Sequence, residues 1–331
     1  MQSLLLGLRV AQSSVCSHML NAFSRTLSRV CDCHFSPKPC SPLVSPKWVE
    51  SHMKKSEEAV RLIDASWYMP FMERDAKQEF LRRRIPGAVF FDIDTVAETS
   101  TGLPHMLPKK EIFEAEMRRI GVRNDDHVVV YDGAGQFSSA RLYYTFLVFG
   151  HCYVSILDGG FPKWEKDGCT TDRNALQHLD DAIQLPKSVY SVSGVKEEHV
   201  WTLSQVMQHL NDPAVQVVDA RSNERFCGRV DEPRPECARG SIPGSFNVPF
   251  DQVLGSDGTF LRPKDIRRAF LKAGINVDAE KLVFSCGSGV TASILFAAAE
   301  RMGIPRSRLA VYDGSWAEWG SIDDTPKQVL L

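Results

Sequence analysis

The chain has 331 residues, of which 43% are hydrophobic and 24% are charged, and its formal net charge is −2. This length predicts two domains, each large enough for a core of its own. The near-neutral charge argues against nucleic acid as a partner, and no apolar run reaches the ~18 residues that a membrane span needs. Nine cysteines, an odd number, favour a reducing compartment over a secreted disulfide framework.

Residues 1–45 differ in composition from the rest of the chain. Arginines precede the first acid, Asp32, serines recur, and the apolar stretch near the start is short. This composition is typical of a mitochondrial transit peptide, so we expect a mitochondrial protein that can also occur in the cytoplasm. A disordered tail without a targeting role is the alternative. Cys31-Asp-Cys33-His34 matches no standard zinc spacing, and we expect no metal site.

The remainder of the chain repeats its landmarks at a nearly constant offset of about 155 residues, which indicates a duplicated domain. The matching pairs are Asp64-Ala-Ser with Asp219-Ala-Arg, Ile85-Pro-Gly with Ile242-Pro-Gly, Val128-Val-Val-Tyr-Asp with Leu282-Val-Phe-Ser-Cys, and Leu157-Asp-Gly with Tyr312-Asp-Gly.

Each half alternates short β-branched runs with helical stretches such as 108–120 and 264–273. Such alternation predicts an α/β fold in which a parallel sheet is flanked by helices in each half. We expect the first domain at 46–185, a linker at 186–199 and the second domain at 200–325.

Cys286 ends an apolar strand and opens a glycine-rich loop. The residues after it, 290–302, predict a helix with Gly303 as its stop signal. The start of a helix offers free backbone N–H groups and a partial positive charge, which stabilise a thiolate. Two glycines and a serine follow the sulfur, where a structural core cysteine would need bulk, so the pattern favours a nucleophile. The first half has Asp132 at the equivalent position and no thiol in its loop.

These repeated landmarks resemble those of the rhodanese-type sulfurtransferases over about residues 45–325. The resemblance implies two tandem rhodanese-like domains, of which the second is catalytic. The loop Cys286-Gly-Ser-Gly-Val-Thr291 is similar to that of the 3-mercaptopyruvate sulfurtransferases, whereas the thiosulfate sulfurtransferases have Cys-Arg-Lys-Gly-Val-Thr, whose two cations suit a dianionic donor.

The resemblance implies that Cys286 takes sulfur from 3-mercaptopyruvate, releases pyruvate and forms a persulfide. Thioredoxin, a small thiol or cyanide would accept the sulfur, and a reducing thiol would release hydrogen sulfide. No cofactor is implied, because the sulfur itself carries the transferred group. A thiosulfate sulfurtransferase and a non-catalytic persulfide carrier are the alternatives, and the carrier could dispense with the donor-binding and proton-transfer residues.

Site residues follow by position in the family motif. Arg225 and Arg234 correspond to the two arginines that bind the donor, since a guanidinium suits its carboxylate and carbonyl. Arg229, between them, is expected on the surface. Cys227 and Cys237 flank these arginines, and no pairing rule decides whether they are redox-active.

Cleavage of the carbon–sulfur bond leaves an enolate that must gain a proton. The resemblance implies a relay of Ser288, His105 and Asp94, in which the histidine transfers the proton and the acid orients it. Spacing alone leaves Asp92 as an alternative to Asp94.

The loop has a second implied task. Gly287 and Gly289 allow the backbone to come close to the sulfur, and the amides of Val290 and Thr291 are expected to stabilise the persulfide.

Two other readings of the loop fit less well. Gly287-Ser-Gly-Val-Thr-Ala292 imitates a dinucleotide-binding fingerprint, but too few residues follow it for the rest of that unit. A cysteine phosphatase would need an arginine shortly after the loop, where Thr291-Ala-Ser293 stands.

Overall fold

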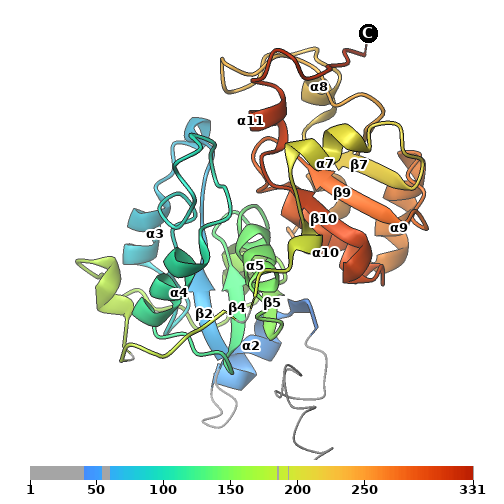
Figure 1. Cartoon of the computed structure of the whole chain (residues 1–331). Helices are drawn as coiled ribbons and strands as arrows, with labels where there is room; N and C mark the ends of the chain where they lie inside the picture. The colour runs from blue at the N-terminus through green and yellow to red at the C-terminus, as the bar shows by residue number, and fades with distance from the viewer. Residues whose placement is uncertain (1–40, 54–59, 185, 193, 331) are drawn as a thin grey trace, which may run out of the picture. The chain divides into compact units, whose positions relative to one another are not determined.

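We analysed a computed structural model of the chain. The structure describes residues 41–53, 60–184, 186–192 and 194–330. The predicted leader and its Cys31-Asp-Cys33-His34 cluster therefore lie outside the described residues, apart from the leader's last five positions. Two halves with the same architecture make up the described part (Figure 1).

The first half contains, in chain order, β1 (Leu43–Val44), α2 (Pro46–Met53), β2 (Val60–Asp64), η1 (Pro70–Met72), α3 (Ala76–Arg82), β3 (Val89–Phe90), α4 (Lys110–Arg119), β4 (His127–Tyr131), α5 (Ser139–Val148), β5 (Val154–Leu157), α6 (Gly160–Lys166) and η2 (Leu179–Ala182), where η marks a 3₁₀-helix.

The second half contains η3 (Glu197–His199), β6 (Val200–Trp201), α7 (Leu203–Gln208), β7 (Val215–Asp219), α8 (Asn223–Phe226), β8 (Phe246–Asn247), η4 (Phe250–Val253), α9 (Pro263–Lys272), β9 (Lys281–Ser285), α10 (Ala292–Arg301), η5 (Arg306–Arg308), β10 (Leu309–Tyr312) and α11 (Ser315–Trp319).

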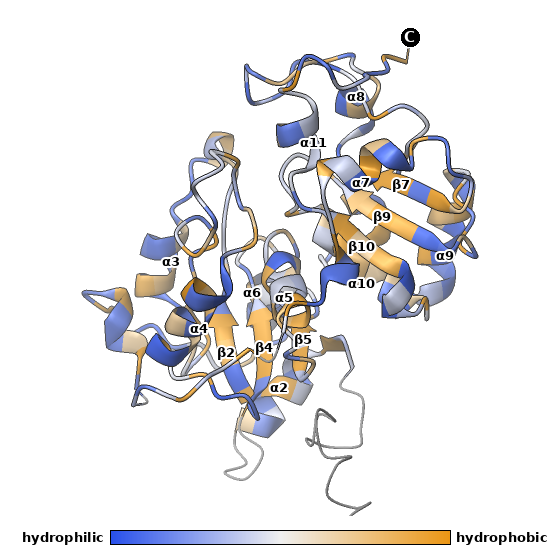
Figure 2. Ribbon diagram, viewed as in Figure 1, coloured by the Kyte–Doolittle hydropathy of each residue, from blue (hydrophilic) through white to orange (hydrophobic). Residues whose placement is uncertain are grey.

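Each half has a five-stranded parallel sheet, and the two sheets share one strand order: β1-β5-β4-β2-β3 and β6-β10-β9-β7-β8. The central strands are hydrophobic because helices cover both faces (Figure 2). β4 is buried along its whole length, and β9 is buried from its second residue onward. The predicted α/β fold, with a parallel sheet flanked by helices in each half, is confirmed.

The register of the second sheet determines what surrounds Cys286. Asp219 at the end of β7 pairs with Ser285 at the end of β9. The backbone N–H of Ala220 donates to the Ser285 carbonyl at 2.8 Å. The Asp219-Ala-Arg221 landmark and the Cys286 loop therefore leave the same edge of the sheet side by side.

The helix predicted for 290–302 begins two residues later than expected, as α10. Ser293 and Ile294 donate their N–H groups to the carbonyls three residues before them, those of Val290 and Thr291. These tight turns belong to the loop, so regular α-helix starts only at Ala292. Helices α4 and α9 lie within a residue or two of their predicted limits.

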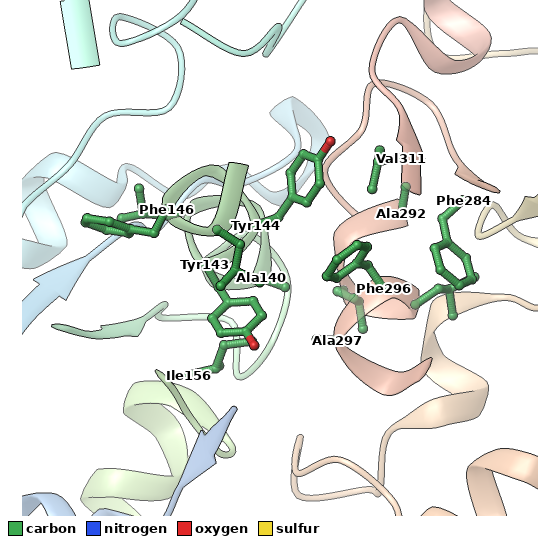
Figure 3. Close-up of a cluster of buried hydrophobic side chains, with 14 of the residues drawn as sticks. Ala140, Tyr143, Tyr144, Phe146, Ile156, Phe284, Ala292, Phe296, Ala297 and Val311 are labelled. Carbon is green, nitrogen blue, oxygen red and sulfur yellow. The ribbon is translucent and has the colours of Figure 1, made fainter. Parts of the chain in front are cut away.

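Helices α5 and α10, one from each half, pack against each other. Tyr144 and Phe296 meet edge to face with ring centroids 5.4 Å apart (Figure 3). Both belong to one hydrophobic cluster that combines residues of the two halves. The two sheets therefore share a core. This shared core places loops of the first half next to the Cys286 loop.

Candidate active site

Cys286 directly follows β9, at the carboxyl end of the sheet, where ligands of open α/β folds bind. It is 1% exposed. Its backbone N–H donates to Ser315 Oγ at 3.2 Å, and its carbonyl accepts from the N–H of Trp316 at 3.0 Å. Both partners belong to α11, so the last helix of the second half fixes the backbone of the cysteine.

A cavity of about 650 Å³ opens beside Cys286. Both halves line it. The first half supplies an aromatic and glycine-rich wall, and the second half supplies the cysteine loop and three arginines. The lining residues include Trp67, Gly135, Phe137, Arg221, Arg225, Arg234, Asp251, Cys286, Gly287, Ser288, Val290 and Thr291.

In the first half, the loop that corresponds to the Cys286 loop surrounds the side chain of Asp132. The buried carboxylate of Asp132 accepts six backbone N–H groups, from each residue of 134–139, at 2.9 to 3.2 Å. We call these six N–H groups the amide cradle. A cradle of this kind is a binding site for one negative charge placed just beyond Cβ.

By the repeat, Cys286 stands where Asp132 stands, and residues 288–293 correspond to the amide cradle. Gly289 has φ +78° and its counterpart Gly135 has φ +89°, so both loops make a left-handed turn there. The loops differ at the next position, because Gln136 is also left-handed whereas Val290 is not. The roles predicted for Gly287, Gly289, Val290 and Thr291 stay predictions.

The predicted relay residues come together across the two halves. Nδ1 of His105, in the first half, lies 2.8 Å from Oγ of Ser288, in the second half. Nε2 of the same ring lies 2.9 Å from Asp94 Oδ1. The hydrogen bond from His105 holds the pKa of Asp94 below its usual value. Asp94, rather than Asp92, contacts the histidine, because Asp92 forms an ion pair with Lys77 at 2.5 Å.

Trp67 contacts two of the predicted relay residues, and sequence reasoning missed it. Its Nε1–H donates to Asp94 Oδ2 at 3.0 Å, and its ring meets the His105 ring edge to face at 4.6 Å. The tryptophan therefore fixes both the acid and the imidazole. Its position directly after the Asp64-Ala-Ser66 landmark is the signal that could have found it.

Arg141 and Asp313 are a second pair that sequence reasoning missed. Nη2 of Arg141 donates to the His105 carbonyl and to Asp313 Oδ1, at 2.5 Å each. The other Asp313 oxygen accepts the N–H of Leu107 at 2.9 Å. His105 has φ +56°, which is unusual for a non-glycine residue, and these bonds hold it there. A Cβ on Gly289 would lie 2.8 Å from Arg141 Nη1, so only glycine fits beside the arginine.

The two predicted donor-binding arginines reach the Cys286 loop. A Cβ built on Gly287 would lie 3.2 Å from Arg225 Nη2 and 3.9 Å from Arg234 Nη1. Glycine at 287 thus leaves room for both guanidinium groups beside the cysteine. Arg229, expected on the surface, is exposed.

An acidic side chain that sequence reasoning did not single out joins these arginines. Glu232 accepts hydrogen bonds from Arg221 and from Arg225. Arg221 is fully buried and also donates to Asp219. Burial alone would lower the pKa of Arg221, but the two carboxylates more than offset it and raise that pKa.

Cys227 and Cys237, which flank the arginines, are buried free thiols. Sγ of Cys237 lies 4.0 Å from the Ala317 carbonyl, and burial raises the pKa of its thiol. A raised pKa lowers the fraction of thiolate, which is the form that reacts. Cys152 is an exposed cysteine far along the chain from the site.

The described residues include no group of three or more His, Cys, Asp or Glu side chains that could hold a metal ion. In the part of the chain that the structure describes, no helix has the length and apolar character needed to span a membrane.

Comparison with known proteins agrees with this architecture. A family model described as a rhodanese-like domain matches residues 45–167 and 202–322. The mitochondrial thiosulfate/3-mercaptopyruvate sulfurtransferase 1 of Arabidopsis thaliana is 39% identical over 86% of this chain and 77% of its own length. The 3-mercaptopyruvate sulfurtransferase of Homo sapiens is 36% identical over 86% of this chain and 93% of its own length.

Among solved structures, SseA of Escherichia coli, described as a 3-mercaptopyruvate sulfotransferase with the rhodanese fold, matches with a TM-score of 0.73 and 34% identity. The match covers 83% of this chain and 99% of that one. The chain belongs to the rhodanese family. Within that family it is a sulfurtransferase with two tandem rhodanese-like domains. The limits that we gave to the domains and the linker stay a prediction.

Proposed function

We propose that this sulfurtransferase takes its sulfur from 3-mercaptopyruvate and carries it as a persulfide on Cys286. The observation that carries the proposal is the 2.8 Å contact between His105 Nδ1 and the hydroxyl of Ser288, two residues after the cysteine. A proton relay beside the nucleophile is useful when the leaving group is carbon. Thiosulfate releases sulfite, a stable anion that needs no proton, so the relay favours the 2-oxo acid donor.

The first half-reaction conserves atoms and charge. The Cys286 thiolate attacks the sulfur of 3-mercaptopyruvate, an S–S bond forms, and the C–S bond breaks. The electron pair of the C–S bond stays on carbon as the enolate of pyruvate. The relay delivers a proton to that carbon, and the proton of the donor's thiol replaces it. The products are pyruvate and the Cys286 persulfide anion.

The donor-binding residues have complementary tasks. Arg225 and Arg234 would bind the carboxylate and the carbonyl of the 2-oxo acid, which also withdraws charge from the developing enolate. Asp94 and Trp67 would keep the imidazole of His105 turned toward Ser288.

The amide cradle of the first half supports the persulfide. A carboxylate ends two atoms beyond Cβ, and so does a persulfide anion. Asp132 is thus a built-in analogue of the charged, sulfur-loaded cysteine, held by six N–H groups. We infer that amides of 288–292, among them those of Val290 and Thr291, bind the persulfide in the same way.

In the second half-reaction a nucleophilic acceptor attacks the outer sulfur. The S–S bond to Cys286 breaks, and its electron pair returns to the cysteine as a thiolate. A thiolate acceptor, from thioredoxin or a small thiol, becomes a persulfide, and cyanide becomes thiocyanate. A second thiol would then release hydrogen sulfide from the acceptor persulfide and leave a disulfide. The cavity of about 650 Å³ has room for a small acceptor once pyruvate has left.

Thiosulfate is the second candidate donor, because the name of the Arabidopsis relative includes it beside 3-mercaptopyruvate. Steady-state assays with 3-mercaptopyruvate plus thioredoxin, and with thiosulfate plus cyanide, distinguish the two donors. We expect a higher kcat/KM with 3-mercaptopyruvate. A higher value with thiosulfate would reject the proposed donor, and a single loaded sulfur without turnover would identify a carrier.

Intact mass spectrometry tests the site itself. Incubation with 3-mercaptopyruvate alone should add one sulfur to the wild-type protein and none to Cys286→Ser. Sulfur uptake by Cys286→Ser would move the nucleophile to another cysteine, such as Cys227 or Cys237.

We also propose that the protein is mitochondrial and occurs in the cytoplasm as well. The basic, serine-rich composition of residues 1–45 supports this, as does the name of the mitochondrial Arabidopsis relative. Residues 1–45 fused to a fluorescent protein should direct it to mitochondria, and a diffuse signal alone would contradict this.

A further inference from the structure

Glu232 is a buried carboxylate inside the cluster of arginines at the cavity. Its side chain is only 3% exposed. Oε1 accepts from Arg221 Nη1 at 2.8 Å and from Arg225 Nε at 3.1 Å, and Oε2 accepts from Arg225 Nη2 at 2.5 Å. The glutamate therefore grips Arg225 with both oxygens while it touches Arg221 with one.

The arginine cluster has one more positive charge than negative charges, and among the described residues the unpaired positive charge is that of Arg234. Arg221 is already paired with Asp219 through Nη2 and Oδ2, at 2.7 Å. Glu232 compensates Arg225. Within the residues that the structure describes, the guanidinium of Arg234 has no acidic partner. Three cations and two carboxylates thus leave one positive charge, located on the arginine that no acid holds.

We propose that Glu232 is a specificity-determining residue of the donor site. It fixes the guanidinium of Arg225 in place and reduces the charge of the site to that of a single cation, which suits a donor with one negative charge. This inference rests on the proposed function, because 3-mercaptopyruvate carries one carboxylate beside a neutral thiol, whereas thiosulfate carries two negative charges.

The Glu232 carboxylate repels the two donors to different degrees. Repulsion from Glu232 acts once on a monoanion and twice on a dianion. At separations of several Å and an effective dielectric constant of ~20, one additional charge alters affinity by roughly tenfold or more. The neutral Gly287 and Ser288 act in the same direction, since they add no cation. The remaining charged residue of the lining, Asp251, is exposed, so water screens it.

Glu232→Gln removes the charge and keeps the shape of the side chain. We expect the ratio of kcat/KM for thiosulfate to kcat/KM for 3-mercaptopyruvate to rise at least tenfold. Glu236→Gln is the matched control, because Glu236 lies in the same loop but is exposed and does not line the cavity. In that control the ratio should change less than twofold.

Glu232→Asp separates charge from position. Aspartate keeps the negative charge but is too short to reach both arginines, so kcat/KM for 3-mercaptopyruvate should fall about tenfold while the donor ratio stays within about threefold of the wild type. A ratio unchanged in Glu232→Gln, or raised equally in Glu232→Asp, would overturn the inference. The Asp arm also keeps the inference testable if Glu232→Gln does not fold.

A readout without turnover separates this inference from the proposed donor. Sulfate and pyruvate should each slow the alkylation of Cys286 by iodoacetamide, and Glu232→Gln should improve protection by sulfate about tenfold more than protection by pyruvate. Equal changes for both anions would reject the charge argument. Failure of the proposed function would instead appear in the wild type, as a higher kcat/KM with thiosulfate.

Discussion

Arg141 Nη2 and Asp313 Oδ1 lie 2.5 Å apart and join the first half of the chain to the second, with side chains only 3% and 7% exposed. Arg141 lies in α5 and also donates a hydrogen bond to the His105 carbonyl, whereas Asp313 directly follows β10. The pair therefore sets the distance between the proposed proton relay and the loop that carries Cys286. Coupling between the halves depends on this contact as well as on the shared core of α5 and α10.

Asp313→Asn should destabilise the protein, because it leaves the Arg141 guanidinium buried without its counter-charge. Breaking one side of a buried pair costs about 3–5 kcal/mol. The free energy of unfolding measured in urea gives this loss directly, and kcat should fall as His105 loses its position. Asp180→Asn is the control, since its pair with Arg119 is exposed and is worth less than ~1 kcal/mol. Equal losses in the two variants would show that burial of the pair is irrelevant.

Ser288→Ala should lower kcat with 3-mercaptopyruvate by about 10²-fold or more, because a positioned acid–base group contributes roughly that much. Stopped-flow measurement of pyruvate release isolates the step. Ser285→Ala is a matched control, one residue before Cys286, because the buried Ser285 hydroxyl has no hydrogen-bond partner among the described atoms. A Ser288→Ala enzyme as fast as Ser285→Ala would remove the hydroxyl from the mechanism.

Gly287→Ala should reduce kcat/KM for 3-mercaptopyruvate several-fold, since the new Cβ would press on Arg225 Nη2 at 3.2 Å. Gly287→Arg combined with Ser288→Lys should go further and shift the preference toward thiosulfate. Gly194→Ala serves as control, because nothing lies within 4 Å of a Cβ at that glycine. If the double variant keeps its preference for 3-mercaptopyruvate, the loop does not select the donor.

Asp132→Ala should destabilise the first half, because six N–H groups, four of them buried, lose their acceptor and each buried group left unsatisfied costs about 1–3 kcal/mol. Water that enters the cradle would recover part of this, so we expect a net loss of about 3 kcal/mol or more in chemical denaturation. Asp323→Asn, at an exposed position, should change stability by less than 0.5 kcal/mol. Similar midpoints for both variants would contradict the importance of the cradle.

Burial raises the pKa of Asp64 from 3.8 to about 7, with Ser66 as its hydrogen-bond donor. The folded protein therefore holds a proton that the unfolded chain has lost, and stability should fall as pH rises from 3.8 to about 7. Asp64→Asn should flatten this part of the curve of unfolding free energy against pH. A wild-type curve as flat as that of Asp64→Asn would reject the assignment.

The repeat, the order of elements and the neighbourhood of Cys286 could be predicted from the sequence because they depend on local patterns. Alternating apolar runs predict the strands, and a cysteine before Gly287 and Gly289 predicts a loop at a strand end. His105 and Asp94 were predicted by resemblance rather than from physical chemistry. Their spacing in the chain does not distinguish Asp94 from Asp92, whereas the three-dimensional structure does, through Lys77.

Trp67, Arg141 and Glu232 could not be predicted in this way, because their roles arise from contacts between distant segments. Arg141 lies in an otherwise uncharged helix and meets Asp313 across 172 positions of the chain. Glu232 is one acid in a charged loop, and only the folded structure separates it from Glu236. Contacts between such distant residues can be identified only from the three-dimensional structure, in which the two halves share a core.

The carboxylate of Asp132 has a consequence for the energetics of the whole catalytic cycle. In the first half the side chain of Asp132 always occupies the amide cradle. In the second half, on the proposed role of Cys286, the corresponding N–H groups bind an anion only while the cysteine carries sulfur as a persulfide. A group that is held by the folded state alone stabilises that state. The donor would then do more than supply an atom: with each turnover it temporarily completes the architecture of the enzyme, and the acceptor returns the enzyme to its less stable form.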